Sequence, residues 1–558
     1  MLRNVFYRVA LAAAVLLILA SRPAILGAQQ APADVPAVTI RANTRLVVVD
    51  VVVTDKKGQP VTGLKAEDFT VEENGKKQKV SVFVPPGAAQ PAAQPLPPGI
   101  LSNRPEFLRP PGVPTVLLLD VANSPFKDQA YGRLQMLKYV QAQEESGTPM
   151  AVMTLTDRLH VLQEFTSDPK TLATAIRNLR PQQQPFQPGA TPVSSSTAAG
   201  LGTIGSGTAA AISMAQAQIA DFQNGVAGFN LLRRTEITIA AMRDLSRVLA
   251  GFPGRKNVVW LTAEFPFDLI PEDRNMSNAE LAADLPNIRK KSLSTISAGT
   301  LASEARQMHG DEIKQAESQL ASSDIAIYPV DMRGIMSSGI DVANTGTMEE
   351  VAAETGGKAY TNQNEVKFGI ALAVSDEKAS YTLGYYPDNK KWDGKYRSVK
   401  VNVTQGDTQV RYRKGYFAIE PGQIKNYNYE QDVAAALQVN APATQVSFMA
   451  QAKPTAPGKI RVIFLVDALT LTAEDAGGGK KMNVSLYASV YNAAGKNMGT
   501  RSMKVDRTFD AATYQQILDK GMMVPIDIEI SAGSKELRLA VLDNKTGFIG
   551  TVSGPLGE

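Results

Sequence analysis

The sequence of 558 residues contains no cysteine and only two histidines, His160 and His309. Without cysteine the chain can form no disulfide, no thiolate zinc site and no cysteine nucleophile. The two histidines stand far apart in the sequence, which removes most histidine-ligated metal sites and argues against a serine–histidine hydrolase. The composition therefore argues against an enzyme.

An excess of one charge is missing as well. The chain has 58 basic and 54 acidic residues, a net charge of +4, and no long basic run interleaved with aromatic residues. This balance argues against nucleic acid as a partner. After the first residues no stretch is apolar enough to span a membrane.

Residues 1–28 have the layout of a secretory signal peptide. Arg3 and Arg8 precede an apolar stretch from Val9 to Ala20, and small residues follow up to Ala28. The apolar stretch is shorter than the ~20 residues of a spanning helix, which favours removal over a retained membrane anchor. We expect a mature protein that is periplasmic or secreted to the extracellular space, with no membrane span.

The remaining chain is too long for one core, since single domains usually stop growing near ~250–300 residues. Residues 44–84 combine valine-rich runs with the pair Asn74-Gly75. Asn-Gly between two strand-like runs predicts a tight hairpin, and so a small antiparallel β unit. Residues 85–114 are rich in proline and are interpreted as a linker.

From residue 115 to 376, strand and helix signals alternate. Val116–Leu119, Met150–Thr156, Val258–Thr262 and Ile325–Val330 are apolar runs of strand length, and amphipathic stretches separate them. This alternation predicts a mostly parallel sheet with helices on both faces. Residues 181–228, rich in Gln, Pro, Ser, Ala and Gly, are interpreted as a low-complexity insertion.

Strand signals return after Ser380. Residues 380–420 contain three strand-like stretches, and residues 427–558 alternate as a C-terminal β-sandwich would. The unit at 44–84 is small and needs a partner sheet to cover its apolar face. We therefore predict that 44–84 and 380–420 complete one composite sandwich, with the α/β domain inserted between them.

Several stretches together resemble the von Willebrand factor A family, and more specifically the acidobacterial von Willebrand factor A-related proteins. They are PTVLLLDVANSPFKDQAYGRLQMLKY, AVMTLTDRLHVLQEFTSD, FPGRKNVVWLT, IAIYPVDMRG, AAETGGKAY and SYTLGYYPDNKKWDGKYRSVKV. The resemblance covers roughly residues 44–418. It implies a doubly wound, mostly parallel, Rossmann-like α/β sheet, here flanked by antiparallel β-sandwich elements. It also implies a protein that binds other proteins, often through magnesium.

The family's metal loop, Asp-x-Ser-x-Ser, falls on VLLLDVANSPF. Asp120 matches the aspartate and Ser124 the second serine, while Ala122 replaces the first serine. Thr191 matches the threonine of the second loop, and Ala263 stands where the third loop has its aspartate. Magnesium prefers six hard oxygens, so an incomplete set holds it poorly.

We interpret this loop as a degenerate metal-ion-dependent adhesion site that binds Mg²⁺ weakly or not at all. On this reading Asn123 hydrogen bonds across the loop or takes part in ligand binding. The plainer alternative has Asp120 accepting backbone N–H groups and Ser124 capping the next helix. Asp331, at the end of IAIYPV, borders a ligand crevice or simply caps its own loop.

Aromatic residues crowd the strands after Ser380, and they are either a platform for a ligand or, as we favour, cross-strand packing. They are Tyr381, Tyr385, Tyr386, Trp392, Tyr396, Tyr412, Tyr416 and Phe417. The expected function is protein–protein interaction or adhesion without catalysis. The alternatives are a structural component of an envelope assembly, with the aromatic strands as its contact surface, and a metal-dependent hydrolase.

Overall fold

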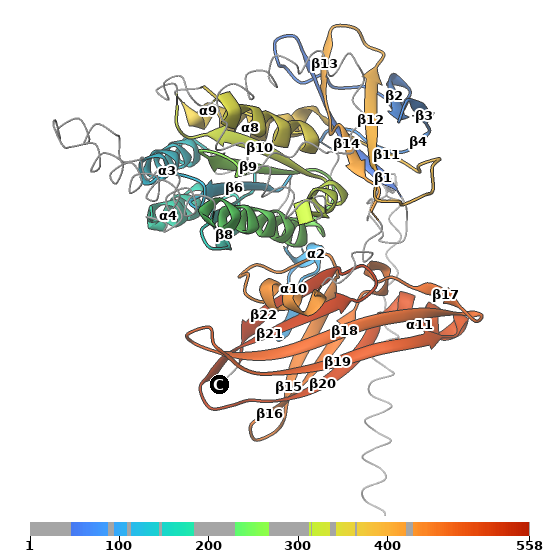
Figure 1. Ribbon diagram of the computed structural model, residues 1–558. Coiled ribbons are helices and arrows are strands. Elements are labelled where there is room, and N and C mark those ends of the chain that lie inside the picture. The colour runs from blue at the N-terminus through green and yellow to red at the C-terminus, as the bar shows by residue number, and fades with distance from the viewer. Residues whose placement is uncertain are drawn as a thin grey trace, which may run out of the picture. The chain divides into compact units, whose positions relative to one another are not determined.

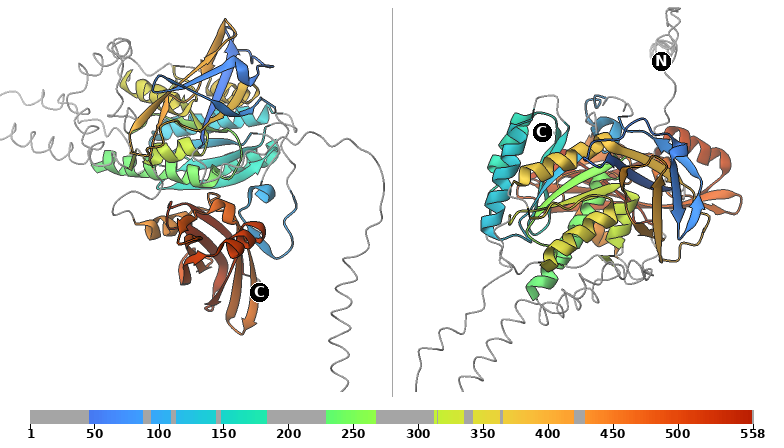
Figure 2. Two further views of the ribbon diagram at one scale, coloured as in Figure 1. Left: turned by 90° about the vertical axis from the view of Figure 1, so that its right-hand side faces the viewer. Right: turned by 90° about the horizontal axis from the view of Figure 1, so that it is seen from above.

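The structure is a computed structural model, shown in Figures 1 and 2. It describes residues 46–87, 94–108, 113–143, 148–182, 229–266, 312–313, 315–334, 342–362, 365–419 and 428–556. The chain divides into residues Met1–Val38, which are outside these ranges, and a unit Thr39–Glu558 to which all that follows refers. The predicted signal peptide and almost all of the low-complexity insertion therefore lie outside the described residues.

The strands before the proline-rich segment pair with those after Ser380. One four-stranded sheet has the order β13-β1-β11-β4 and the other the order β14-β12-β2-β3. Their bounds are β1 Val47–Asp55, β2 Phe69–Glu73, β3 Lys76–Gln78, β4 Val80–Val84, β11 Ser380–Tyr385, β12 Tyr396–Val403, β13 Thr408–Arg411 and β14 Gly415–Phe417. The inward-facing residues of both sheets share one apolar core, and a 3₁₀ turn, η1 (Ala66–Asp68), precedes β2.

This pairing explains the aromatic residues after Ser380. Tyr381, Tyr385, Tyr416 and Phe417 are buried, and the Tyr381 ring packs 5.2 Å from that of Phe69 across the two sheets. Side chains buried inside a sandwich stabilise it by packing and are not available as a contact surface. An envelope contact through these four aromatic residues is therefore excluded.

The α/β domain is built on a five-stranded mixed sheet with the order β10-β9-β6-β7-β8. Its strands are β6 Thr115–Asp120, β7 Met150–Leu155, β8 Leu159–Thr166, β9 Lys256–Thr262 and β10 Ile325–Asp331. All neighbours run parallel except β8, which is antiparallel to β7 at the edge.

Helices cover both faces of this sheet, which is why its central strands are apolar throughout. Val116 and Leu118 of β6 face the helix at residues 229–249, the helix at 315–322 and α8 (Val342–Thr355). Leu117 and Leu119 face α3 (Phe126–Gln141), α4 (Pro169–Asn178) and α9 (Val366–Ser375), which leads into η3 (Asp376–Ala379). The carboxyl ends of β6, β9 and β10 thus meet at one edge of the sheet.

The C-terminal region contains two further antiparallel sheets that enclose one apolar core. One sheet has the order β20-β16-β15-β5, where β5 is Ile100–Ser102. In the other sheet β18 pairs with β17, β19 and β21, and β21 pairs in turn with β22. Their bounds are β15 Phe448–Ala456, β16 Lys459–Val466, β17 Glu474–Ala476, β18 Gly479–Asn492, β19 Asn497–Phe509, β20 Met522–Glu529, β21 Ser534–Asp543 and β22 Ile549–Pro555. The helices are α10 Tyr429–Ala436, η4 Ala468–Thr470 and α11 Ala511–Lys520.

The interpretation of residues 85–114 as a linker needs correction. Ile100–Ser102 form β5, which pairs with β15 at the edge of a C-terminal sheet, and α2 (Pro105–Leu108) follows. Asn103, fully buried, fixes this segment by donating to the carbonyl oxygens of Ala443 (2.7 Å) and Val446 (2.8 Å) and accepting from the N–H of Phe448 (2.8 Å). A three-residue edge strand is too short to show a period, and edge positions tolerate nearby prolines.

No helix among the described residues is long and apolar enough to cross a membrane.

Candidate functional site

The loop after β6 is closed around the Asp120 carboxylate, which is fully buried. Its Oδ1 accepts the backbone N–H of Asn123 at 2.9 Å. Its Oδ2 accepts from the Asn123 amide at 3.0 Å, from the Trp260 indole N–H at 2.9 Å and from the Thr262 hydroxyl at 3.0 Å. Four donors from three residues thus surround one side chain, and the Thr262 hydroxyl is shared with the carbonyl oxygen of Glu264 at 2.7 Å.

The donors on Asp120 come from the neighbouring parallel strand as well as from its own loop. Leu118 of β6 is paired with Trp260 of β9, so the ends of these strands lie side by side. Burial raises the pKa of Asp120 above its ordinary value of 3.8, and the hydrogen bonds from Asn123, Trp260 and Thr262 oppose that rise. The loop therefore holds a carboxylate by internal hydrogen bonds alone.

Asn123 and Ser124 are also engaged by neighbouring elements. The Asn123 amide donates to the Thr238 hydroxyl (2.9 Å) as well as across the loop to Asp120. Ser124 Oγ accepts the N–H of Ala263 at 3.0 Å. The alternative that Ser124 caps α3 is wrong: the N-cap of α3 is Pro125, with no side-chain cap, because the serine oxygen is turned toward the end of β9.

These contacts do not fit a magnesium ion. Trp260 Nε1 is a donor only and cannot turn an oxygen toward a cation. Asn123 Oδ1 is buried and has no hydrogen-bond partner among the described residues, but a single amide oxygen falls far short of the six oxygens that magnesium prefers. Ala122 and Ala263 offer no side-chain oxygen. Among the described residues no group of three or more His, Asp or Glu side chains could hold a metal. Thr191, the fourth expected position, lies outside the described residues.

Two ion pairs complete the carboxyl edge. Arg234, on the helix at 229–249, pairs with Glu264 just after β9, and both side chains are largely buried. Asp331 caps its own loop by accepting the backbone N–H of Arg333 at 2.8 Å, and its carboxylate also binds that guanidinium at 3.0 and 2.9 Å. Sequence reasoning missed both arginines. Arg234 becomes adjacent to Glu264 only through the fold, whereas Arg333 stands two residues after Asp331 and its pairing could have been proposed from the sequence.

Both charged and apolar side chains are exposed at this edge, and the charged ones include Lys127, Asp157 and Arg158. Phe126, the first residue of α3 and two residues beyond Ser124, keeps 46% of its surface exposed. Phe229, at the start of the helix that carries Arg234, keeps 63%. The two phenylalanines thus expose apolar area at the starts of two helices.

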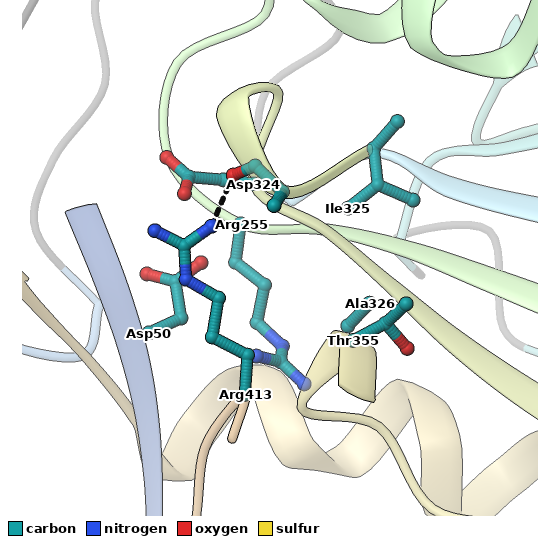
Figure 3. A pocket seen from close by; sticks show the side chains of 8 residues that line it. Asp50, Arg255, Asp324, Ile325, Ala326, Thr355 and Arg413 are labelled. Carbon is teal, nitrogen blue, oxygen red and sulfur yellow. Dashed lines mark hydrogen bonds between the residues drawn. The ribbon is translucent and has the colours of Figure 1, made fainter. Parts of the chain in front are cut away.

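A second group of charged residues lies at the opposite, amino ends of the strands (Figure 3). Arg255 precedes β9, Asp324 precedes β10, Asp50 comes from β1 and Arg413 from the segment between β13 and β14. They surround a cavity of about 20 Å³, which is room for a water molecule and not for a substrate. Arg413 donates to the carbonyl oxygens of Ala321 (2.6 Å) and Val48, so it joins the composite sandwich to the α/β domain.

Burial shifts the pKa values of charged residues at this end of the sheet. It raises the pKa of Asp324 to about 7, with the nearby Asp50 adding to the rise. Burial also lowers the pKa of Lys256, the first residue of β9, whose ammonium donates to the carbonyl oxygen of Phe252 at 2.9 Å. These residues form a structural contact in the fold.

No family model and no curated protein matches the chain. Similar solved structures include an aerotolerance-related membrane protein from Bacteroides fragilis (13% identity, 48% of this chain and 100% of that one, TM-score 0.24). Others are mussel byssus proximal thread matrix protein 1 with a zinc-occupied metal-ion-dependent adhesion motif (12%, 49% and 47%, 0.23) and a von Willebrand factor type A protein from Catenulispora acidiphila (9%, 93% and 75%, 0.19). Likenesses at these TM-scores establish neither the fold nor the function of this chain.

Proposed function

We propose that this chain is a non-catalytic protein-binding module with a doubly wound sheet of the von Willebrand A type. Its partner is held by the carboxyl edge of β6, β9 and β10 without a bridging metal. The observation that carries this proposal is the closed Asp120 loop, whose carboxylate is occupied by four donors from Asn123, Trp260 and Thr262. A magnesium ion that bridges to a partner carboxylate would have to displace these donors from Asp120.

The chemistry of the edge supports binding over catalysis. Two pairs of its charged side chains are bound to each other within the chain, Arg234 with Glu264 and Asp331 with Arg333. No described group of acidic and histidine side chains gathers there for a hydrolytic metal. Phe126 and Phe229 supply exposed apolar area of the kind that anchors protein interfaces. The signal-like residues 1–28 and the von Willebrand A-like segments support a periplasmic or extracellular setting.

Site-specific crosslinking tests this proposal. A photoreactive amino acid replaces Phe126 in one variant and Leu469 in η4 in another, and both are exposed to envelope extract of the producing cell. Leu469 is a matched control because it is apolar and 39% exposed but lies in the C-terminal region. We expect a discrete adduct from position 126 only, at equal yield with Mg²⁺ or with EDTA. An adduct lost in EDTA, or equal adducts from both positions, would contradict the proposal.

A further inference from the structure

The strand β19 presents a long free edge in the C-terminal region (Figure 1). It pairs with β18 from Asn497 to Phe509, and no other described strand pairs with it. Among the described residues its backbone has no hydrogen-bonding partner beyond β18 from residue 500 to 509. A row of N–H and C=O groups of this length is a template for one more strand.

The side chains of β19 are exposed on both faces. Val505 and Phe509 pack against the C-terminal core, which fixes the odd-numbered residues as the inward face. Arg501 and Arg507 share that face and are nevertheless exposed, as are their even-numbered neighbours. The side chains of this part of the strand are therefore little covered by the opposite sheet.

The charge of this edge selects its partner. Arg501, Lys504 and Arg507 are exposed and have no ion pair among the described residues, whereas the single acidic residue, Asp506, is paired with Lys481 at 3.2 Å. The three cations are spaced symmetrically about Lys504. An antiparallel second copy of β19 centred there would place Arg501 opposite Arg507 and Lys504 opposite Lys504, which is unfavourable. The edge disfavours its own copy and favours a strand that carries carboxylates.

We propose that β19 is a docking edge for an extended acidic segment of another protein, which binds by β-strand addition to the β18–β19 sheet. Backbone hydrogen bonds provide the pairing, and carboxylates on the incoming strand meet Arg501, Lys504 and Arg507. The site is separate from the carboxyl edge of the α/β sheet and does not depend on what that edge binds.

The probe is a fluorescein-labelled ten-residue threonine peptide with glutamate at every third position, so that its carboxylates fall on both faces of the strand as Arg501, Lys504 and Arg507 do. It is titrated with the protein and followed by fluorescence anisotropy. Two further peptides serve as comparisons: one with lysine in place of glutamate, and one with the same glutamates but fully N-methylated backbone. We expect binding of the first peptide only. Equal binding of the N-methylated peptide would show that charge alone attracts the peptide, and no binding of the first would remove the site; either result overturns the proposal.

Variants locate the binding on β19. We expect a triple variant to bind the acidic peptide roughly 10–100-fold more weakly, because three exposed ion pairs become repulsive contacts. The variant combines Arg501→Glu, Lys504→Glu and Arg507→Glu, and it should bind the lysine peptide. The control makes the same change in net charge at three exposed lysines elsewhere, Lys453→Glu, Lys520→Glu and Lys535→Glu. We expect it to keep at least half of the affinity.

Equal losses in the two triple variants would overturn the proposal, since net charge alone would then explain the binding. Anionic phosphatidylglycerol vesicles give the remaining comparison. Vesicle binding that needs the three β19 cations, in the absence of peptide binding, would assign the strand to a lipid surface and would also overturn it. Because all three cations are exposed, circular dichroism should show the fold unchanged in both variants.

Discussion

Replacing Thr262 by valine removes one of the donors that hold the Asp120 carboxylate, with little change of shape. The hydroxyl lies 3.0 Å from Oδ2 and 2.7 Å from the carbonyl oxygen of Glu264, so these two acceptors share its one proton, and Thr262 and Asp120 are fully buried. A hydrogen bond to a charged group contributes about 1.5–3 kcal/mol to stability. We expect Thr262→Val to lower the free energy of unfolding of the α/β domain by that amount near pH 8.

The loss should depend on pH. Burial places the pKa of Asp120 in the folded protein above 3.8, so its contribution to stability falls as pH rises from about 4 through that folded value. Thr262 favours the ionised form, and its removal raises the folded pKa further. The deficit of the variant should therefore be smaller at pH 4.5 than at pH 8.

The assay uses the two tryptophans of the sequence. In a Trp392→Phe background, fluorescence reports Trp260 alone and so follows the α/β domain through urea unfolding. The matched control is Thr115→Val: Thr115, on β6, is fully buried and its hydroxyl has no hydrogen-bond partner in the described structure. We expect that change to be neutral or stabilising at both pH values. Equal losses of stability for Thr262→Val and Thr115→Val, or a loss that does not change with pH, would contradict the hydrogen bond from Thr262 to the Asp120 carboxylate.

Three further changes test the fold around the site. The stability of the wild type should decline between about pH 4 and 7 as the buried Asp324, with a pKa of about 7, ionises, and Asp324→Asn should abolish this decline. Asparagine is neutral and tolerates the φ of 49° at this position. Unfolding at pH 5 and pH 8 measures the effect, and a decline that persists in the variant would contradict it. Glu73→Ala should cost about 3–5 kcal/mol, since it leaves Arg397 buried without its carboxylate, whereas calorimetry should find Glu72→Ala nearly neutral. Asn103→Ala should cost at least about 2 kcal/mol by removing three buried hydrogen bonds, and an unchanged melting temperature would argue against the role of β5.

The sequence could predict the features that depend on local pattern. A strand between two layers of helices has no polar side, so the apolar run Val116–Leu119 predicts a strand that is buried on both faces. In the structure this strand lies between two layers of helices. Residues 44–84 are too few to cover their own apolar face, which predicts a partner sheet from elsewhere in the chain. The pairing of β1 with β11 confirms this prediction. Strand β5 could not be predicted, because three residues between prolines are too few to show an alternating pattern of apolar and polar residues.

The closure of the site depends on residues far apart in the chain. Trp260 is 140 positions from Asp120, and within VVWLT it reads as one more apolar side chain. One signal was present: a buried tryptophan needs an acceptor for its N–H, and the aspartate ending a neighbouring strand can provide it. Arg234 gave no such signal, since only the fold brings it to Glu264.

Calorimetric titration of Mg²⁺ and Mn²⁺ into the mature protein, with Asp120→Ala beside it, tests the central claim most directly. Because four donors occupy the Asp120 carboxylate, we expect neither protein to bind either ion in the micromolar range. Micromolar binding by the wild type that the variant lacks would show that Asp120 is free to ligate a metal, and would contradict a partner held without one.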